Sequence, residues 1–319
     1  MARYTLNRIG LGLISLLLLT MMVYAAAQVL PGNPGRLVLG REATPEAVEQ
    51  FNDRLGFDRP LPVRYADWLS DAVRGDFGAN YTDGRAVTDD LVPALQRSAL
   101  LALYAFVLCV PLSILAGVIA AIRRGRPLDR SITVAGLSLA VIPDFVLGAI
   151  LVAVFGPAFL NWFPGIAGFL DDQSLLTKLD SLFLPALALA LVLFGYIARI
   201  TRAGTIEALT ADYTRTATLK GLSQRKIMMT HVVRNGLLPT IAVVATQVGY
   251  MFGGIVAIEK LFGYPGIGLL TLSAAQVKNF PMLLAAVLVI GVIYFVATLL
   301  GDLLTAALNP RIRLGGGER

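Results

Sequence analysis

Long stretches without a charged residue constrain this chain more than any other feature of its sequence. Six runs approach the roughly 20 apolar residues that a helix needs to cross a bilayer. They predict membrane-spanning helices near residues 9–30, 98–122, 132–155, 181–200, 237–258 and 281–304. Because these runs lack the alternating polar residues of a transmembrane barrel, we predict an all-α integral membrane protein with six spans.

Composition supports a membrane protein and excludes several classes of site. Charged residues make up 15% of the 319-residue chain, whereas a soluble domain carries about a quarter. The mean hydropathy is +0.71. One cysteine, Cys109, and one histidine, His231, leave no disulfide framework and no multi-thiolate metal site. We therefore predict no metal and no catalytic residues, and we attribute the net charge of +6 to cytoplasmic loops rather than to nucleic-acid binding.

Short loops differ in their content of arginine and lysine, which predicts orientation. The segment RRGRPLDR between spans two and three has four arginines, and residues 199–236 after span four are also basic. Loops 156–180 and 259–280 carry one and two lysines. Both termini and 199–236 are therefore expected in the cytoplasm, with loop 31–97 outside. The alternative for the first span is a cleaved signal peptide ending near AAAQ at 25–28, although the apolar run is long for one.

The outer loop, 31–97, carries the signals of short helices. Thr44 and Pro45 fit an N-cap and a first helical position, and Gly56 follows the last turn. A second group falls at helical spacing before Gly75: Tyr65, Trp68, Leu69, Ala72 and Val73. We predict a packed helical cap on the outer face.

The basic segment between spans four and five reads as two helices joined by a turn. One apolar helix face is predicted by four residues spaced three or four apart: Ile206, Leu209, Tyr213 and Ala217. Gly221 fits a left-handed C-cap, and Ser223 can cap the second helix. From these residues alone, the partner of the apolar face is either the bilayer interface or a groove on a cytoplasmic protein.

Motifs along nearly the whole chain resemble the permease subunits of ABC importers, specifically the dipeptide, oligopeptide and nickel importer family. Residues 212–239 carry the family's motifs in order: Asp212-Tyr213, Arg215-Thr216-Ala217, Lys220-Gly221-Leu222-Ser223, His231, Arg234-Asn235 and Leu238-Pro239. Further similar stretches are LPGNPGR (30–36), LGFDRPLPVRY (55–65), RGDFG (74–78), IEKLFGYPGIG (258–268) and LNPRIR (308–313). Asn33 and Asn309 stand where the family usually has aspartate.

The resemblance implies the fold of a type I ABC importer permease and a division of the chain. Residues 1–30 would form the first transmembrane helix, and 31–97 an extracytoplasmic helical loop. Residues 98–310 would form a five-helix core with a cytoplasmic coupling segment at 202–236, followed by a cytoplasmic tail at 311–319.

The resemblance also implies partners and cargo. Expected partners are a paralogous permease, two ATPase subunits or domains and an extracytoplasmic substrate-binding protein, all at a bacterial or archaeal cytoplasmic membrane. The chain has no GxxxxGK[ST] motif, so ATP and magnesium would bind to the ATPases, and this chain would hold no cofactor and be no enzyme. Peptides are the expected cargo, with nickel, glutathione or oligosaccharide as alternatives for the same machinery.

Three groups of candidate functional residues follow. Contacts that couple the chain to an ATPase are expected at Glu207, Asp212, Tyr213, Arg215, Thr216, Ala217, Lys220, Gly221, His231 and Arg234. The translocation pathway is expected at Pro143, Asp144 and Gln247. An extracytoplasmic gate or binding-protein contact is expected at Glu259, Phe262, Pro265 and Gly266.

Asp144 is a departure from the family, which commonly has a small polar residue at this place. A carboxylate at membrane depth costs several kcal/mol unless it faces water or a partner, so we predict that Asp144 faces the pathway. A salt bridge to a neighbouring subunit, or a wetted position near the outer surface, would also accommodate it.

Two other classes of protein are weaker alternatives. An ion-coupled secondary transporter predicts several intramembrane acids and internal repeats, whereas only Asp144 lies clearly inside a span. A membrane enzyme would need a cluster of His, Cys or carboxylate side chains, which the sequence lacks.

The predicted orientation can be tested by cysteine labelling. Cysteines introduced at Asp67 and Arg225, in a Cys109→Ser background, should react from opposite sides of intact cells because the basic loops stay in the cytoplasm. An impermeant reagent added outside should label the Asp67 site alone. Labelling of both sites from outside would overturn the orientation.

Overall fold

The protein is described by a computed structural model that places residues 2–29, 34–40, 42–54, 56, 59–168 and 175–308. The regular elements within these ranges are helices, accompanied by one isolated β-bridge between Ala79 and Ala86, so the all-α prediction is confirmed. The motif residues 30–33 and 309–313, and the predicted tail, lie outside the described ranges.

The chain divides into two compact units. Unit 1 comprises Met1–Arg8, Leu100–Tyr264 and Tyr294–Arg319, and unit 2 comprises Ile9–Ala99 and Pro265–Ile293. The boundaries fall after Tyr264 and inside three long helices, which begin at Ala2, Val87 and Phe280, so these helices contribute to both units.

Five helices in the described part of the chain are long and apolar enough to cross a membrane, and they overlap predicted spans one, two, four, five and six. These helices are α1 (Ala2–Val29), α5 (Val87–Ile122), α8 (Leu175–Thr210), α12 (Leu238–Phe262) and α14 (Phe280–Leu308). A bent pair of helices makes a sixth crossing if it is counted as one span.

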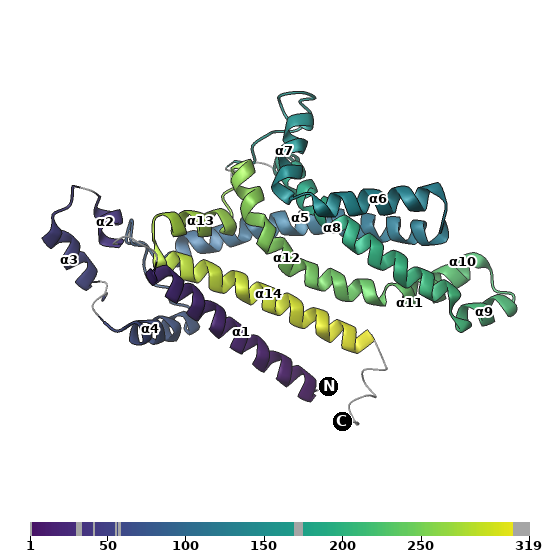
Figure 1. Ribbon diagram of the computed structural model, residues 1–319, viewed down its shortest axis with the longest axis horizontal. Coiled ribbons are helices and arrows are strands. Elements are labelled where there is room, and N and C mark those ends of the chain that lie inside the picture. Colours follow the sequence, from purple (N-terminus) through teal and green to yellow (C-terminus); the bar gives the residue numbers. More distant parts are fainter. Residues whose placement is uncertain are drawn as a thin grey trace. The chain divides into compact units, whose positions relative to one another are not determined.

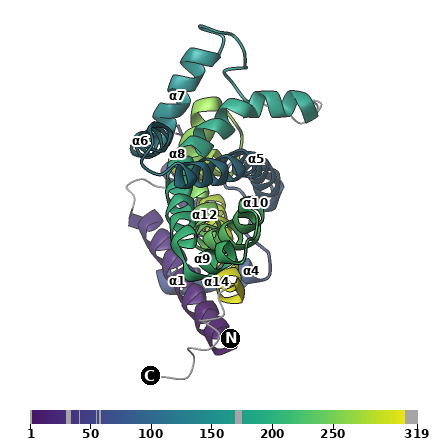
Figure 2. The same cartoon turned by 90° about the vertical axis from the view of Figure 1, so that its right-hand side faces the viewer.

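The predicted third span, 132–155, is this bent pair rather than one straight helix. Helix α6 (Pro127–Val141) and helix α7 (Asp144–Phe155) meet at an angle of 108° (Figure 2). Pro143 explains the break, because a proline disfavours helical backbone in the residue before it and has no N–H to continue a helix. Ile142 is accordingly extended, and the Pro143 carbonyl accepts the first hydrogen bonds of α7.

Unit 1 is assembled on α8. Helices α6, α7 and α12 pack along it, as Figure 1 shows. At its end lie α9 (Asp212–Leu219), α10 (Gln224–Ile227), the π-helical turns Met228–Val233 and α11 (Arg234–Gly236), which lead into α12.

Glycines allow helices to approach α8 closely. Gly195 of α8 faces Gly136 of α6, and Gly204 of α8 faces Gly236 of α11. A Cβ atom on Gly195 or Gly204 would overlap the backbone opposite. Small residues at such crossings are the usual means by which helices associate in a membrane, where lipid removes the hydrophobic driving force.

Unit 2 contains the short helices predicted for the outer loop. The predicted helices are α3 (Pro45–Arg54) and α4 (Leu61–Val73), and the unit also contains α2 (Pro34–Leu39), which was not predicted from the sequence, and α13 (Ile267–Gln276). Thr44 caps α3 as predicted, since its hydroxyl accepts the Ala47 N–H at 3.3 Å. Tyr65 of α4 hydrogen-bonds Thr20 of α1 at 2.9 Å and packs edge-on against Tyr24, which holds α4 on α1.

Candidate coupling segment and translocation site

The turn at the centre of the basic segment has the predicted left-handed glycine. Gly221 has φ +74°, its N–H donates to the Thr218 carbonyl, and the Leu222 N–H donates to the Ala217 carbonyl at 3.3 Å. This pair of bonds is a Schellman motif, in which glycine avoids the steric penalty of a side chain. Ser223 then caps α10, because its hydroxyl accepts the Lys226 N–H at 3.4 Å.

The apolar residues of the segment pack against one another. Four buried side chains form its small core, with Leu209, Leu222 and Met228 packed around them: Ala208, Ala217, Ile227 and Val232. The single face predicted from Ile206 to Ala217 does not form, because Ala211 is extended and separates α8 from α9. Most of the apolar surface that was expected to need an outside partner is therefore covered by the segment itself.

Three large apolar side chains remain exposed on the segment. Leu219 is 81% exposed, Met229 66% and Tyr213 42%. Most of the predicted ATPase-coupling residues are exposed with them: Glu207, Asp212, Arg215, Thr216, Lys220, Gly221 and Arg234. Two of the predicted contacts are placed differently, since Ala217 is buried in the core and His231 is half-buried in the π-helical turns.

Residues 201–204 of α8 form a stem beneath the segment, and polar contacts hold this stem to two neighbouring helices. Thr201 and Thr240 of α12 share a hydrogen bond at 3.1 Å. Arg202 makes two hydrogen bonds to Asp129 of α6, at 2.6 and 2.8 Å. These bonds tie the base of the segment to α6 and α12, and the Gly204–Gly236 contact joins the two ends of the segment.

Asp144 lies at the first position of α7, directly after the break at Pro143. Its carboxylate accepts the Phe145 N–H at 2.8 Å and lies against Gly254 of α12, where a Cβ atom would overlap it. Gln247, which is 8% exposed, lies seven residues before Gly254, on the same face of α12 and roughly 10 Å along its axis.

The predicted outer gate residues are mostly buried. Glu259 and Phe262 of α12 are each 0% exposed, and the Phe262 carbonyl accepts the Ala167 N–H at 2.8 Å. Gly266 is buried at the start of α13, while the Pro265 carbonyl accepts a hydrogen bond from Arg97 at 3.4 Å. Glu259, Phe262 and Gly266 are therefore buried within the chain, and the role predicted for them stays a prediction.

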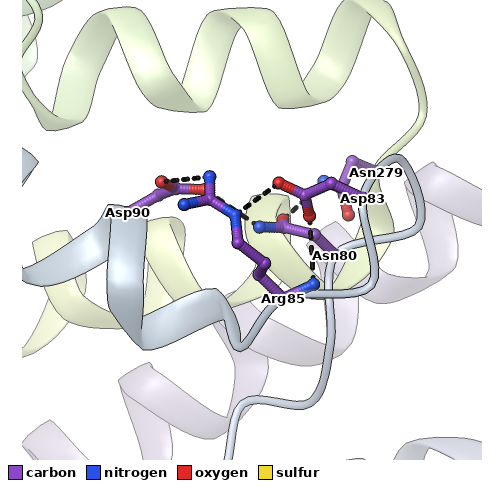
Figure 3. Close-up of polar contacts among 5 residues, drawn as sticks. All are labelled: Asn80, Asp83, Arg85, Asp90 and Asn279. Carbon is purple, nitrogen blue, oxygen red and sulfur yellow. Dashed lines mark hydrogen bonds and ion pairs between the residues drawn. The ribbon is translucent and has the colours of Figure 1, made fainter.

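A polar hairpin of unit 2 is held to the start of α14 by two asparagines (Figure 3). The Asn279 amide donates to the Asn80 side-chain oxygen at 2.8 Å, and the Asn80 amide donates to Asp90 at 3.0 Å. Arg85 joins the hairpin through Asp83 and Asp90, at 2.8 and 3.2 Å. The hydrogen bond from Arg85 holds the pKa of the Asp83 carboxyl below its usual range.

Sequence reasoning missed the Asp129–Arg202 pair and the role of Gly254. Asp129 stands among four arginines in the loop RRGRPLDR, so it was interpreted from the sequence only as one residue of a basic loop. Its partner lies 73 residues away, and no local spacing connects the two. Within the described residues, no group of three His, Cys, Asp or Glu side chains is placed to hold a metal ion.

Comparison with known proteins identifies the family. Residues 113–314 match the binding-protein-dependent transport system inner membrane component, and residues 1–88 match the N-terminal part of such components. The glutathione transport system permease protein GsiC of Escherichia coli K12 is 33% identical over 317 residues, covering 98% of this chain and 99% of that protein. GsiC of Shigella dysenteriae serotype 1 has the same identity and coverage.

A solved structure supports the same fold. The crystal structure of an amino acid ABC transporter with histidines has a TM-score of 0.50 and 16% identity, covering 70% of this chain and 94% of that chain. The expected resemblance is thereby confirmed, and the chain belongs to the binding-protein-dependent transport system inner membrane components, the permease subunits of ABC importers.

Proposed function

We propose that this chain forms half of the translocation pathway of a bacterial importer for short peptides, driven by two partner ATPases. A paralogous permease would supply the other half, and an extracytoplasmic binding protein would deliver the cargo. ATP and magnesium would bind to the ATPases, and this chain would hold neither. The relatives named as glutathione permeases support a small peptide cargo, because glutathione is itself a tripeptide.

The proposal rests on the folded structure of the coupling segment, residues 202–236. The segment has its own buried core, so it can move as one body, and it still exposes Leu219, Met229 and Tyr213. Large apolar side chains exposed on a segment that also exposes charged residues are typical of protein interaction sites. A groove on an ATPase would cover these side chains, and the ATPase would move the coupling segment when ATP binds.

The break at Pro143 supports a cargo site at membrane depth. Secondary transporters commonly bind cargo where a spanning helix is interrupted, and we propose the same arrangement for this permease. Asp144 presents a carboxylate at such an interruption, and it lies against the same face of α12 that carries Gln247. We propose that this carboxylate receives a positively charged group, such as the free amino terminus of a peptide.

Reconstitution tests the proposed function. The chain should be co-expressed with its paralogous permease, both ATPases and the binding protein, then placed in proteoliposomes. Uptake of glutathione and of di- and tripeptides should require ATP and every component, and the loaded binding protein should stimulate ATP hydrolysis. Uptake driven by a proton gradient without ATP, or a chain that purifies without ATPases, would contradict the proposal.

Two neighbouring glycines of α12 provide a matched test of Asp144. Gly254→Ala places a methyl group against the Asp144 carboxylate, whereas Gly253→Ala points into open space. Gly254→Ala should lower peptide transport per assembled complex by roughly tenfold to a hundredfold, as displacements of about 1 Å do at positioned sites. Gly253→Ala should transport like the wild type.

Asp144→Asn completes this series by removing the charge while keeping the shape. Transport should fall most for peptides with a net positive charge if the carboxylate selects for a cation. Equal transport by Asp144→Asn, Gly254→Ala and the wild type across peptides of differing charge would remove Asp144 from the pathway.

A further inference from the structure

The Asp129 carboxylate is the centre of a buried polar joint between α6 and α8. Arg202 binds both of its oxygens, the Gly125 N–H donates to Oδ2 at 2.8 Å, and the Thr133 hydroxyl lies 3.5 Å from Oδ1. The Asp129 side chain is 5% exposed, and that of Arg202 is 28% exposed. Both carboxylate oxygens are therefore satisfied within the chain.

The geometry of this joint suits positioning better than it suits stability. Burying an ion pair gains little stability over apolar packing, because desolvation offsets the attraction. A bidentate arginine–carboxylate pair, in contrast, fixes both the distance and the orientation of the two side chains. The joint therefore holds the start of α6 at a set position against α8.

The joint lies where α8 enters the coupling segment. Arg202 follows Thr201, which is bonded to α12, and precedes Gly204, which lies against Gly236 of α11. The stem is thus fixed to α12 and α11 as well as to α6. A displacement of the coupling segment therefore moves residues 201–204 of α8, and the hydrogen bonds from Arg202 to Asp129 pass this displacement to α6.

Helix α6 connects this joint to the proposed cargo site. Gly136 of α6 lies against Gly195, so α6 follows α8 at a second point about two turns farther along. Beyond it the chain breaks at Pro143 and turns by 108° into α7, which begins with Asp144. We call α6, the break and α7 the elbow.

We infer that the Asp129–Arg202 pair is the joint that passes displacement of the coupling segment to the elbow carrying Asp144. This inference rests on the proposed function, because it assumes that an ATPase moves the segment. The two residues are positioning residues: they touch neither cargo nor ATP, and they act through the place of α6.

The first test measures cargo transported per ATP hydrolysed in proteoliposomes, which we call the coupling ratio. Asp129→Asn and Arg202→Gln each remove the charged pair and retain groups able to form hydrogen bonds. Each should lower the coupling ratio by about 5- to 150-fold, the usual range for coupling between sites. The double variant should lose no more than either single variant, because all three remove the same joint. Arg202→Lys, with one charged donor group, should give an intermediate ratio.

A second ion pair of unit 1 provides the control. Arg8 and Asp302 lie 3.0 Å apart and join α1 to α14, neither of which carries the coupling segment or Asp144. Asp302→Asn should keep the wild-type coupling ratio. The inference is overturned if Asp129→Asn and Arg202→Gln keep that ratio too, or if Asp302→Asn lowers it equally. Failure of the wild-type complex to couple ATP hydrolysis to transport would instead contradict the proposed function.

A distance measurement tests the joint even where a variant assembles poorly. Spin labels at Ser131 of α6 and Thr210 of α8, both exposed, report on the two sides of the joint. In the wild-type sequence with Cys109→Ser, their separation should stay the same in nucleotide-free and ATP-trapped complexes. A separation that changes with nucleotide would show that α6 does not follow α8 and would overturn the inference.

Discussion

The close approach of helix backbones along α8 is the constraint on which unit 1 depends. Gly195 and Gly204 of α8 meet Gly136 and Gly236 with no side chain between them. A larger residue at Gly195 or Gly136 would push α6 outward and separate Arg202 from Asp129, because the two hydrogen bonds between them are only 2.6 and 2.8 Å long. A larger residue at Gly204 would push α11 outward. Packing of small residues therefore sets the geometry, and the polar joint can form only within it.

Features governed by local chemistry could be predicted from the sequence. Uncharged runs located five spanning helices because backbone groups in lipid must be satisfied within the helix. Gly221 and Ser223 were recognisable because left-handed caps and hydroxyl caps have strong residue preferences. The family was likewise recognisable, because its motifs are spread along the whole chain in order.

Features governed by tertiary contact could not be predicted in this way. Pro143 marks a break, but its residue type does not give the 108° direction of the bend. The buried state of Ala217 depends on Ile227 and Val232, which reach it only after the Gly221 turn has formed. The contact of Asp144 with Gly254 joins residues 110 positions apart, and only the packing of α7 on α12 brings them together.

Photo-cross-linking from the coupling segment tests most directly whether an ATPase docks there. A photoreactive residue in place of Leu219, which is 81% exposed, should cross-link to a partner ATPase in the assembled complex. The same residue in place of Leu103 of α5, which is 60% exposed on an apolar span, should not. Cross-links from Leu219 only to lipid, or to the extracytoplasmic binding protein, would contradict the docking of an ATPase on this segment.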